Sequence, residues 1–307
     1  MTIIIGYMKH LMDVSLQKQT VYAYNQVSGK LTSLIVEIEA FLFMTQQTLH
    51  PLRIGVQLHP QQTTYQDFAD AVRRAEDMGV DTIWNWDHFF PLYGDPQGNH
   101  FEGWTLLTAM ATLTSRAKIG CLVTCNTYRN AALLSDMAKT VDHISNGRLI
   151  LGLGAGWFER DYTEYGYDFG TPGSRLAALE QSLETIKHRW EVDVPKPIQN
   201  PIPIMIGGGG EKKTLRITAQ YADMWHSFGD PQTIAHKIEV LDNWCKELGR
   251  NPQEVEHCVS PGGNFDDALL DEYVEVGVTH IILGMGVPWN FDAVKKLVQW
   301  RDSRNNR

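Results

Sequence analysis

Residues 118–157 constrain the fold more than any other stretch of the chain. An apolar run, Ile119–Val123, breaks into a polar segment that ends at Arg129, and a helix of mixed polarity follows. A second apolar run, Leu149–Leu153, then enters a glycine turn before Trp157. This is the order of a parallel βαβ unit, in which both strands end at the same edge of a sheet. We therefore expect the polar segment and the glycine turn to line one opening.

The same alternation continues from Leu52 onward. Short apolar runs alternate with segments whose apolar residues recur at the helical period of 3.6. Uniformly apolar strands are typical of a parallel sheet covered by helices. Eight such units over about 255 residues predict an α/β fold, a (β/α)8 TIM barrel that forms a single domain over residues 51–307. The predicted strands are Leu52–Leu58, Thr82–Phe89, Lys118–Thr124, Leu149–Gly154, Pro203–Gly207, Asp223–Phe228, Val255–Ser260 and His280–Gly284.

The predicted helices carry apolar stripes at helical spacing, and glycines follow several of them. Gly79, Gly249 and Gly277 stand where a left-handed C-cap belongs. The clearest stripes span Phe68–Ala75, Leu176–Trp190 and Ile234–Leu248.

A doubly wound open sheet is the alternative α/β fold. A dinucleotide-binding half of such a sheet carries G-x-G-x-x-G directly after its first strand. Here the first predicted strand runs into His59-Pro60-Gln61-Gln62 instead, so the barrel is favoured.

Composition narrows the function. The formal net charge is −9 and the chain has no Lys/Arg cluster, so we expect no nucleic-acid partner, since phosphate binding requires a basic surface. The apolar segment Leu31–Phe43 has only 13 residues and contains two glutamates, so we expect no membrane span. The four cysteines include no C-x-x-C pair and predict no disulfide framework. These features favour a cytoplasmic protein that acts on small molecules.

Residues 1–50 do not follow the strand and helix alternation. Met44 stands shortly before the first predicted strand. We expect translation to start there, which would make residues 1–43 a dispensable N-terminal extension of the barrel domain.

The Asp87-His88 pair follows the second predicted strand and is the candidate for proton chemistry. A carboxylate can hold a donor, and an imidazole titrates near neutral pH. Neighbouring residues of a strand face opposite ways, so at most one of the two points into the barrel. The alternative is structural, with Asp87 capping the following segment and His88 facing the helix layer.

Gly207–Gly210 lie between a predicted strand and a helix start at 211–213. Free backbone N–H groups and the positive end of a helix dipole suit a phosphate there, although four glycines are also compatible with a tight turn. Gly154 and Gly156 lack the Cβ that would keep a flat ligand from the backbone. We expect Trp157 and Trp225 to lie in the core.

Seven segments in a fixed order resemble the bacterial-luciferase-like flavin/deazaflavin oxidoreductase family. Within that family the chain is most similar to the branch that uses the 8-hydroxy-5-deazaflavin coenzyme F-420. The resemblance covers about residues 52–302. The segments are WDHF (Trp86–Phe89), FEGWTLL (Phe101–Leu107), IGCLVTCNTYRN (Ile119–Asn130), VDHISNGRLILGLGAGW (Val141–Trp157), IMIGGGGEKKTLR (Ile204–Arg216), YADMW (Tyr221–Trp225) and WRD (Trp300–Asp302).

The resemblance implies a (β/α)8 barrel with a deazaflavin ring laid across the strand ends and its phosphate tail in the glycine-rich loop. A cis peptide near Leu122-Val123 would support the back of the ring, and Asp87 would bind its polar edge. The implied cofactor-binding residues are Asp87, Leu122, Val123, Thr124, Asn126, Gly154, Gly156, Gly207, Gly208, Gly209 and Gly210.

The implied reaction is hydride transfer between coenzyme F-420 and a small organic substrate, without a metal. The implied catalytic residues are His88, which exchanges a proton with the substrate, and Asp87. The resemblance also implies a homodimer. Two departures stand out: Trp157 occupies the place of a carboxylate found in sugar-phosphate dehydrogenases, and only Glu191–Ile202 precedes the fifth strand.

Three other functions remain open. The nearest is an FMN-dependent luciferase-like monooxygenase. A metal-dependent barrel hydrolase would use His59, Asp87, His88 and His226, but such enzymes usually carry H-x-H on the first strand, and this chain has Gln57-Leu58-His59. The third is a barrel that binds a cofactor without turnover.

Overall fold

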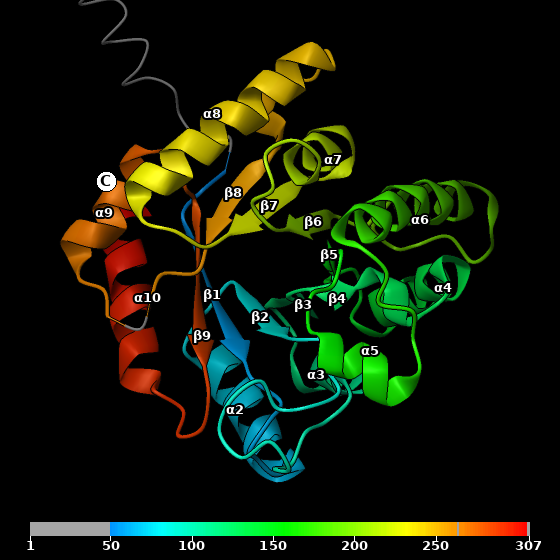
Figure 1. Ribbon diagram of the computed structural model, residues 1–307. Helices are drawn as coiled ribbons and strands as arrows, with labels where there is room; N and C mark the ends of the chain where they lie inside the picture. The colour runs from blue at the N-terminus through cyan, green and yellow to red at the C-terminus, as the bar shows by residue number, and fades with distance from the viewer. Residues whose placement is uncertain (1–49, 263, 306–307) are drawn as a thin grey trace, which may run out of the picture. The chain divides into compact units, whose positions relative to one another are not determined.

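The computed structural model describes residues 50–262 and 264–305, in which strands and helices alternate (Figure 1). The strands are β1 (Arg53–Leu58), β2 (Thr82–Asn85), β3 (Lys118–Cys121), β4 (Thr124–Cys125), β5 (Leu151–Gly154), β6 (Ile204–Gly207), β7 (Met224–Ser227), β8 (Glu256–Val259) and β9 (His280–Met285). The α-helices are α2 (Tyr65–Asp77), α3 (Gly103–Leu113), α4 (Ala131–Ile144), α5 (Glu159–Tyr165), α6 (Pro172–Val192), α7 (Thr214–Tyr221), α8 (Pro231–Glu247), α9 (Asp267–Glu275) and α10 (Phe291–Asn305). Two 3-10 turns are η1 (Asn126–Tyr128) and η2 (Pro252–Glu254).

Parallel pairing arranges the strands in a ring. The order is β3-β2-β1-β9-β8-β7-β6-β5-β4, and the two outer members are parts of one predicted strand. A parallel bridge between Ile119 of β3 and Leu149, just before β5, closes the ring. The helices lie outside the strands (Figure 1). The predicted (β/α)8 TIM barrel is therefore confirmed.

Two predicted strands differ most from the structure. The predicted strand Lys118–Thr124 is interrupted at Leu122-Val123, where the peptide bond is cis at the expected place. The predicted strand Thr82–Phe89 ends at Asn85. The carbonyl oxygen of Asn85 accepts the Leu122 N–H, and this is the last backbone hydrogen bond of the strand. Beyond that point the side chain of Asp87 accepts the Cys125 N–H, so a carboxylate replaces the backbone ladder.

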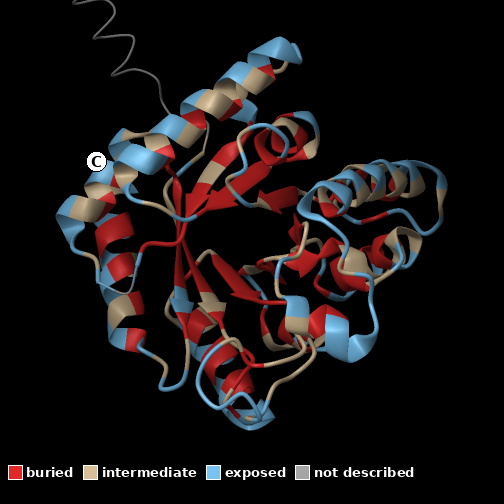
Figure 2. Cartoon of the chain, in the orientation of Figure 1, coloured by how far each residue is buried: buried red, intermediate tan, exposed pale blue. Residues whose placement is uncertain are grey.

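The apolar core has two layers. One fills the barrel and includes Trp84, Leu122 and Ile282; the other lies between the strands and the helices. Figure 2 shows buried strands and exposed outer faces of the helices. The predicted helices are confirmed, because α2, α6 and α8 bury most of the predicted stripes; Leu248, the last residue of the third stripe, is exposed beyond the end of α8. The three glycines predicted as left-handed caps have positive φ. Trp225 is fully buried, as expected.

The N-terminal segment predicted as an extension lies outside the described residues, apart from residue 50. No helix in the described ranges is long and apolar enough to cross a membrane.

Glycines let the third barrel strand approach its neighbour closely. A Cβ on Gly152 would lie 2.1 Å from the carbonyl oxygen of Cys121. This oxygen belongs to the backbone and cannot move without disturbing β3. Gly173 in the first turn of α6 is different, because its nearest side-chain neighbour would be 3.7 Å away.

We expect Gly152→Ala to lower the free energy of unfolding by about 3 kcal/mol or more, since it overpacks a site bounded by backbone. Gly173→Ala is the control and should be neutral or stabilise by up to about 1 kcal/mol. Urea unfolding followed by circular dichroism measures both. Equal stability of the two variants would contradict the close approach.

Candidate active site

A cavity of about 740 Å³ opens at the carboxyl ends of the strands. Its size is typical of a small-molecule site. Residues that follow β1, β2, β5, β7, β8 and the break between β3 and β4 all contribute to its wall. The predicted site residues in this wall are Asp87, His88, Leu122, Val123, Gly156, Gly207, Gly208 and Gly209. The structure thus brings most of the predicted residues to one opening.

Four predicted residues lie near the same strand ends but outside the cavity wall: Thr124, Asn126, Gly154 and Gly210. Thr124 Oγ1 and Asn126 Oδ1 are buried and have no hydrogen-bond partner among the described residues. The space left by the missing Cβ of Gly154 is filled by the Val123 side chain, whose Cγ2 would lie 2.6 Å from such an atom. The roles of these four residues toward a cofactor stay predictions.

Asp87 is buried and held by a charged partner. Arg129 donates to its two carboxylate oxygens at 2.6 and 2.9 Å, and the Cys125 N–H donates at 2.9 Å. Burial alone would lower the pKa of Arg129, but the Asp87 carboxylate raises it above the ordinary value, so Arg129 stays charged. Both oxygens of Asp87 are therefore engaged before any ligand arrives. The predicted contacts of Asp87 with a ring and with a proton stay predictions.

His88 faces the cavity with one ring nitrogen paired. Its Nδ1 lies 2.7 Å from an oxygen of the fully buried Asp161, on helix α5. Trp157 and Phe158 meet the imidazole edge-on, with ring centroids 5.8 and 5.6 Å away. His88 thus occupies an aromatic end of the cavity.

Trp157 is not in the core, contrary to the expectation. It is 64% exposed and forms part of the cavity wall. The reason is local: β5 ends at Gly154, so Trp157 lies on the loop before α5, where strand alternation no longer directs its side chain inward.

The opposite side of the cavity is suited to an anion. Gly208 has φ +127, a conformation that glycine adopts readily. Its N–H donates to the strand, whereas the N–H groups of Gly209 and Gly210 have no partner in the described part of the chain. Ser227 and Lys237 also line this side, and Lys237 pairs with Glu211 across its rim. Helix α7 begins beyond the loop, at Thr214.

Two further histidines in the cavity wall are neutral at physiological pH. Burial lowers the pKa of His226 to about 3, and its Nε2 pairs with Ser260 Oγ at 2.9 Å. Burial lowers the pKa of His59 to about 4, and this ring stacks on Trp86 at 4.3 Å.

The histidines and Asp87 do not form the metal site considered for a hydrolase. His88 pairs with Asp161, His226 with Ser260 and Asp87 with Arg129. Within the described ranges, the group whose ligand atoms lie within 4.8 Å of one another is Glu256, Cys258 and His280. These residues belong to β8 and to the start of β9 and are not part of the cavity wall, and Arg53 donates to both oxygens of Glu256.

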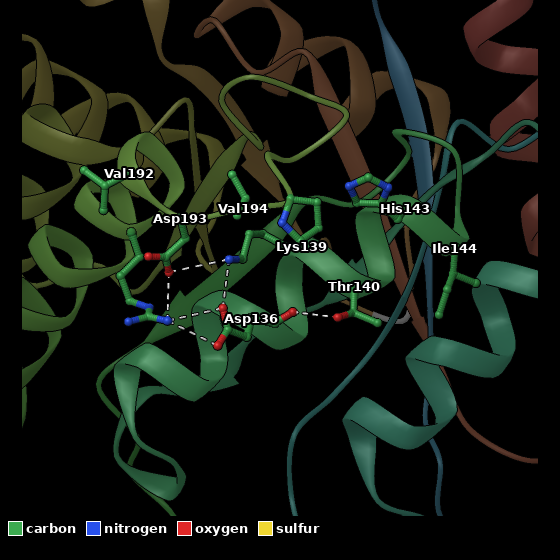
Figure 3. A pocket seen from close by; sticks show the side chains of 10 residues that line it. Asp136, Lys139, Thr140, His143, Ile144, Val192, Asp193 and Val194 are labelled. Atoms are coloured by element: carbon green, nitrogen blue, oxygen red, sulfur yellow. Dashed lines mark hydrogen bonds and ion pairs between the residues drawn. The ribbon is translucent and has the colours of Figure 1, made fainter.

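A second hollow, of about 780 Å³, lies on the outer helix layer between α4 and the end of α6 (Figure 3). Its charged groups pair with one another. Lys139 contacts Asp136 at 2.8 Å, and Arg189 contacts Asp193 at 2.7 Å. It is remote from the strand ends, so the barrel mouth remains the candidate active site.

Comparison with known proteins shows which family the chain belongs to. The sequence model described as luciferase-like monooxygenase matches residues 44–262. The chain belongs to this family. An uncharacterised protein of Mycobacterium tuberculosis is 27% identical over 250 residues, which cover 71% of this chain and 86% of the relative.

Two other similar proteins have a cofactor in their names. The F420-dependent glucose-6-phosphate dehydrogenase of Amycolatopsis mediterranei is 30% identical over 190 residues, or 56% of this chain and 54% of that enzyme. The solved structure of an F420-dependent secondary alcohol dehydrogenase, in complex with an F420-acetone adduct, superposes with a TM-score of 0.72. It is 18% identical and covers 81% of this chain and 98% of its own. That likeness shows the luciferase-like barrel fold.

Sequence reasoning missed Asp161 and Lys237. Lys237 could have been found, because it lies in the early turns of α8, and helices that follow parallel strands begin at the mouth of the barrel. Asp161 carried no such signal. Helix α5 has only seven residues with acidic side chains on several sides, so its period does not tell which of them is buried.

The buried His226 predicts an acid-sensitive fold. The unfolded chain binds a proton there near the ordinary pKa of 6.5 and the folded chain only near 3, so stability falls as pH falls through this window. Between pH 7 and 5 the loss from His226 is about 2 kcal/mol. We expect His226→Gln to remove this part of the pH dependence in urea unfolding. The control is His188→Gln, at an exposed position of α6. A pH dependence equal to that of the wild type would contradict the account.

Proposed function

We propose that the protein is an oxidoreductase that transfers a hydride between coenzyme F-420 and a small organic substrate. One observation carries the proposal: a single cavity joins an anion-binding side, at the loop after β6, to an aromatic end that contains His88. The F420-dependent relatives described above support the choice of cofactor.

The residues present fit a deazaflavin with a phosphate tail. The unpartnered N–H groups of Gly209 and Gly210, together with Ser227 and Lys237, would hold the phosphate. The interruption at Leu122-Val123 would lie behind the ring, since both residues line the cavity between the two sides. When bound, the deazaflavin gives or accepts a hydride at C5.

The protein would supply position, a proton and shelter from water. His88 would give or take the proton through the ring nitrogen that faces the cavity. Trp86, Trp157 and Phe158 surround its ring and would keep water from this end.

The lining also favours an uncharged substrate. Within the described residues the cavity wall contains one lysine and no arginine, and the lysine is at the phosphate side. At the His88 end, where sugar-phosphate dehydrogenases carry a carboxylate, this chain has Trp157. We therefore propose a substrate that binds by apolar contact and one hydrogen bond rather than by ionic pairing.

An FMN-dependent monooxygenase is the second candidate. The same loop would hold the phosphate of FMN, and the family takes its name from monooxygenases. The two functions share the barrel and the phosphate side, so they differ first in which cofactor binds.

Substitution of Lys237 tests whether the loop after β6 holds the phosphate. We expect Lys237→Gln to weaken coenzyme F-420 binding by about 10- to 100-fold, because a charge-assisted hydrogen bond contributes about 1.5–3 kcal/mol. Lys212→Gln is the matched control, since Lys212 lies near the same loop but is exposed and outside the cavity wall. Titration of each purified variant by cofactor fluorescence measures the dissociation constant. Equal weakening by both substitutions would indicate general electrostatics rather than this site.

A further inference from the structure

Asp161 is fully buried and has three hydrogen-bond partners, of which the Tyr128 hydroxyl and the Phe89 N–H are donors. One of its oxygens lies 2.7 Å from His88 Nδ1 and accepts the Tyr128 hydroxyl at 2.9 Å. The other accepts the Phe89 N–H at 3.1 Å. A carboxylate without such partners would be costly to bury, and an ionised carboxylate can accept from the hydroxyl, the backbone N–H and the imidazole together.

This arrangement determines which nitrogen of His88 carries a proton. An ionised carboxylate can only accept, so Nδ1 must be the protonated nitrogen. In the neutral imidazole Nε2 then has a free lone pair, and among the described residues it has no hydrogen-bond partner. Because His88 lines the cavity, Nε2 is the atom that can meet a substrate.

Tyr128 holds the carboxylate from a third element, the turn η1. Burial raises the pKa of its phenol well above the ordinary value, so the hydroxyl keeps its proton and remains a donor to Asp161. Its ring also stacks on Phe89 at 4.7 Å. Asp161 therefore has little freedom to turn away from His88.

We propose that Asp161 is the positioning residue of the active site, and that it fixes His88 as the Nδ1–H tautomer with Nε2 directed at the substrate. The inference rests on the proposed function for its chemical purpose. In dehydrogenation, Nε2 would take the proton as a substrate O–H or N–H bond breaks, and a bound deazaflavin would accept the hydride from the adjacent carbon. The imidazolium so formed is neutralised by Asp161, and reduction reverses both transfers.

The tautomer can be observed without any cofactor. In the full chain labelled with ¹⁵N-histidine, with His88→Gln to assign the signal, we expect neutral wild-type His88 to carry its proton on Nδ1. Asp161→Asn should move the equilibrium toward the Nε2–H form. Glu159→Gln is the matched control, because it removes a charge from an exposed position of the same helix and should leave the signal unchanged.

Two results would overturn the proposal: an Nε2–H tautomer in the wild type, or an unchanged tautomer in a folded Asp161→Asn variant. The first needs only the wild type and the His88→Gln variant that assigns the signal, so the test holds even if Asp161→Asn fails to fold. Tyr128→Phe gives a milder check, since it keeps the carboxylate and should retain the Nδ1–H form.

Measuring turnover of the variants distinguishes a positioning role of Asp161 from a purely structural one. With a substrate found among small ketones and alcohols, Asp161→Asn should lower kcat by about 10²-fold or more, close to His88→Gln. The dissociation constant of coenzyme F-420 should stay within about twofold, and the double variant should be no slower than His88→Gln alone. Additive losses would overturn the proposal. If neither F-420 nor FMN binds, the proposed function fails, while the tautomer measurement still decides the role of Asp161.

Discussion

Parallel hydrogen bonding around a closed ring is the constraint on which the rest of this structure depends. It brings the carboxyl ends of all the strands to one mouth, whatever their separation in the chain. The third barrel strand is interrupted within that ring, and Val123 packs into space that Gly154 and Gly207 leave by having no Cβ. Two glycines that suggested ligand contact in the sequence therefore also make room for the Val123 side chain. The cavity forms where this interruption meets the loops after β5 and β6.

Two buried carboxylates, Asp87 and Asp161, arrange the mouth in different ways. Arg129 occupies both oxygens of Asp87, and this pair connects the end of β2 to the loop after β4. The Asp161 pair is open, because His88 keeps one nitrogen free toward the cavity. Buried charges persist only where partners compensate their desolvation, so each pair is also a constraint on its neighbours. One pair thus supports the scaffold, and the other leaves a ring nitrogen of His88 open to the cavity.

The sequence predicted the barrel because strand and helix periods are local properties that eight repeats reinforce. The positive φ of Gly79 and Gly249 could also be predicted, because a glycine directly after a helical stripe marks a left-handed cap. Family resemblance, rather than periodicity, located the interruption at Leu122-Val123. The pairing of Asp161 with His88 could not be predicted, since it joins residues 73 positions apart through a short helix of uncertain face. Exposure of Trp157 was missed because side-chain direction on a loop follows no period.

Equilibrium titration of the purified protein with coenzyme F-420 and, separately, with FMN tests the central claim most directly. The cavity, its anion-binding side and the F420-dependent relatives together predict micromolar or tighter binding of F-420 and much weaker binding of FMN. Preference for FMN would contradict the hydride-transfer account and assign the protein to the monooxygenases of its family.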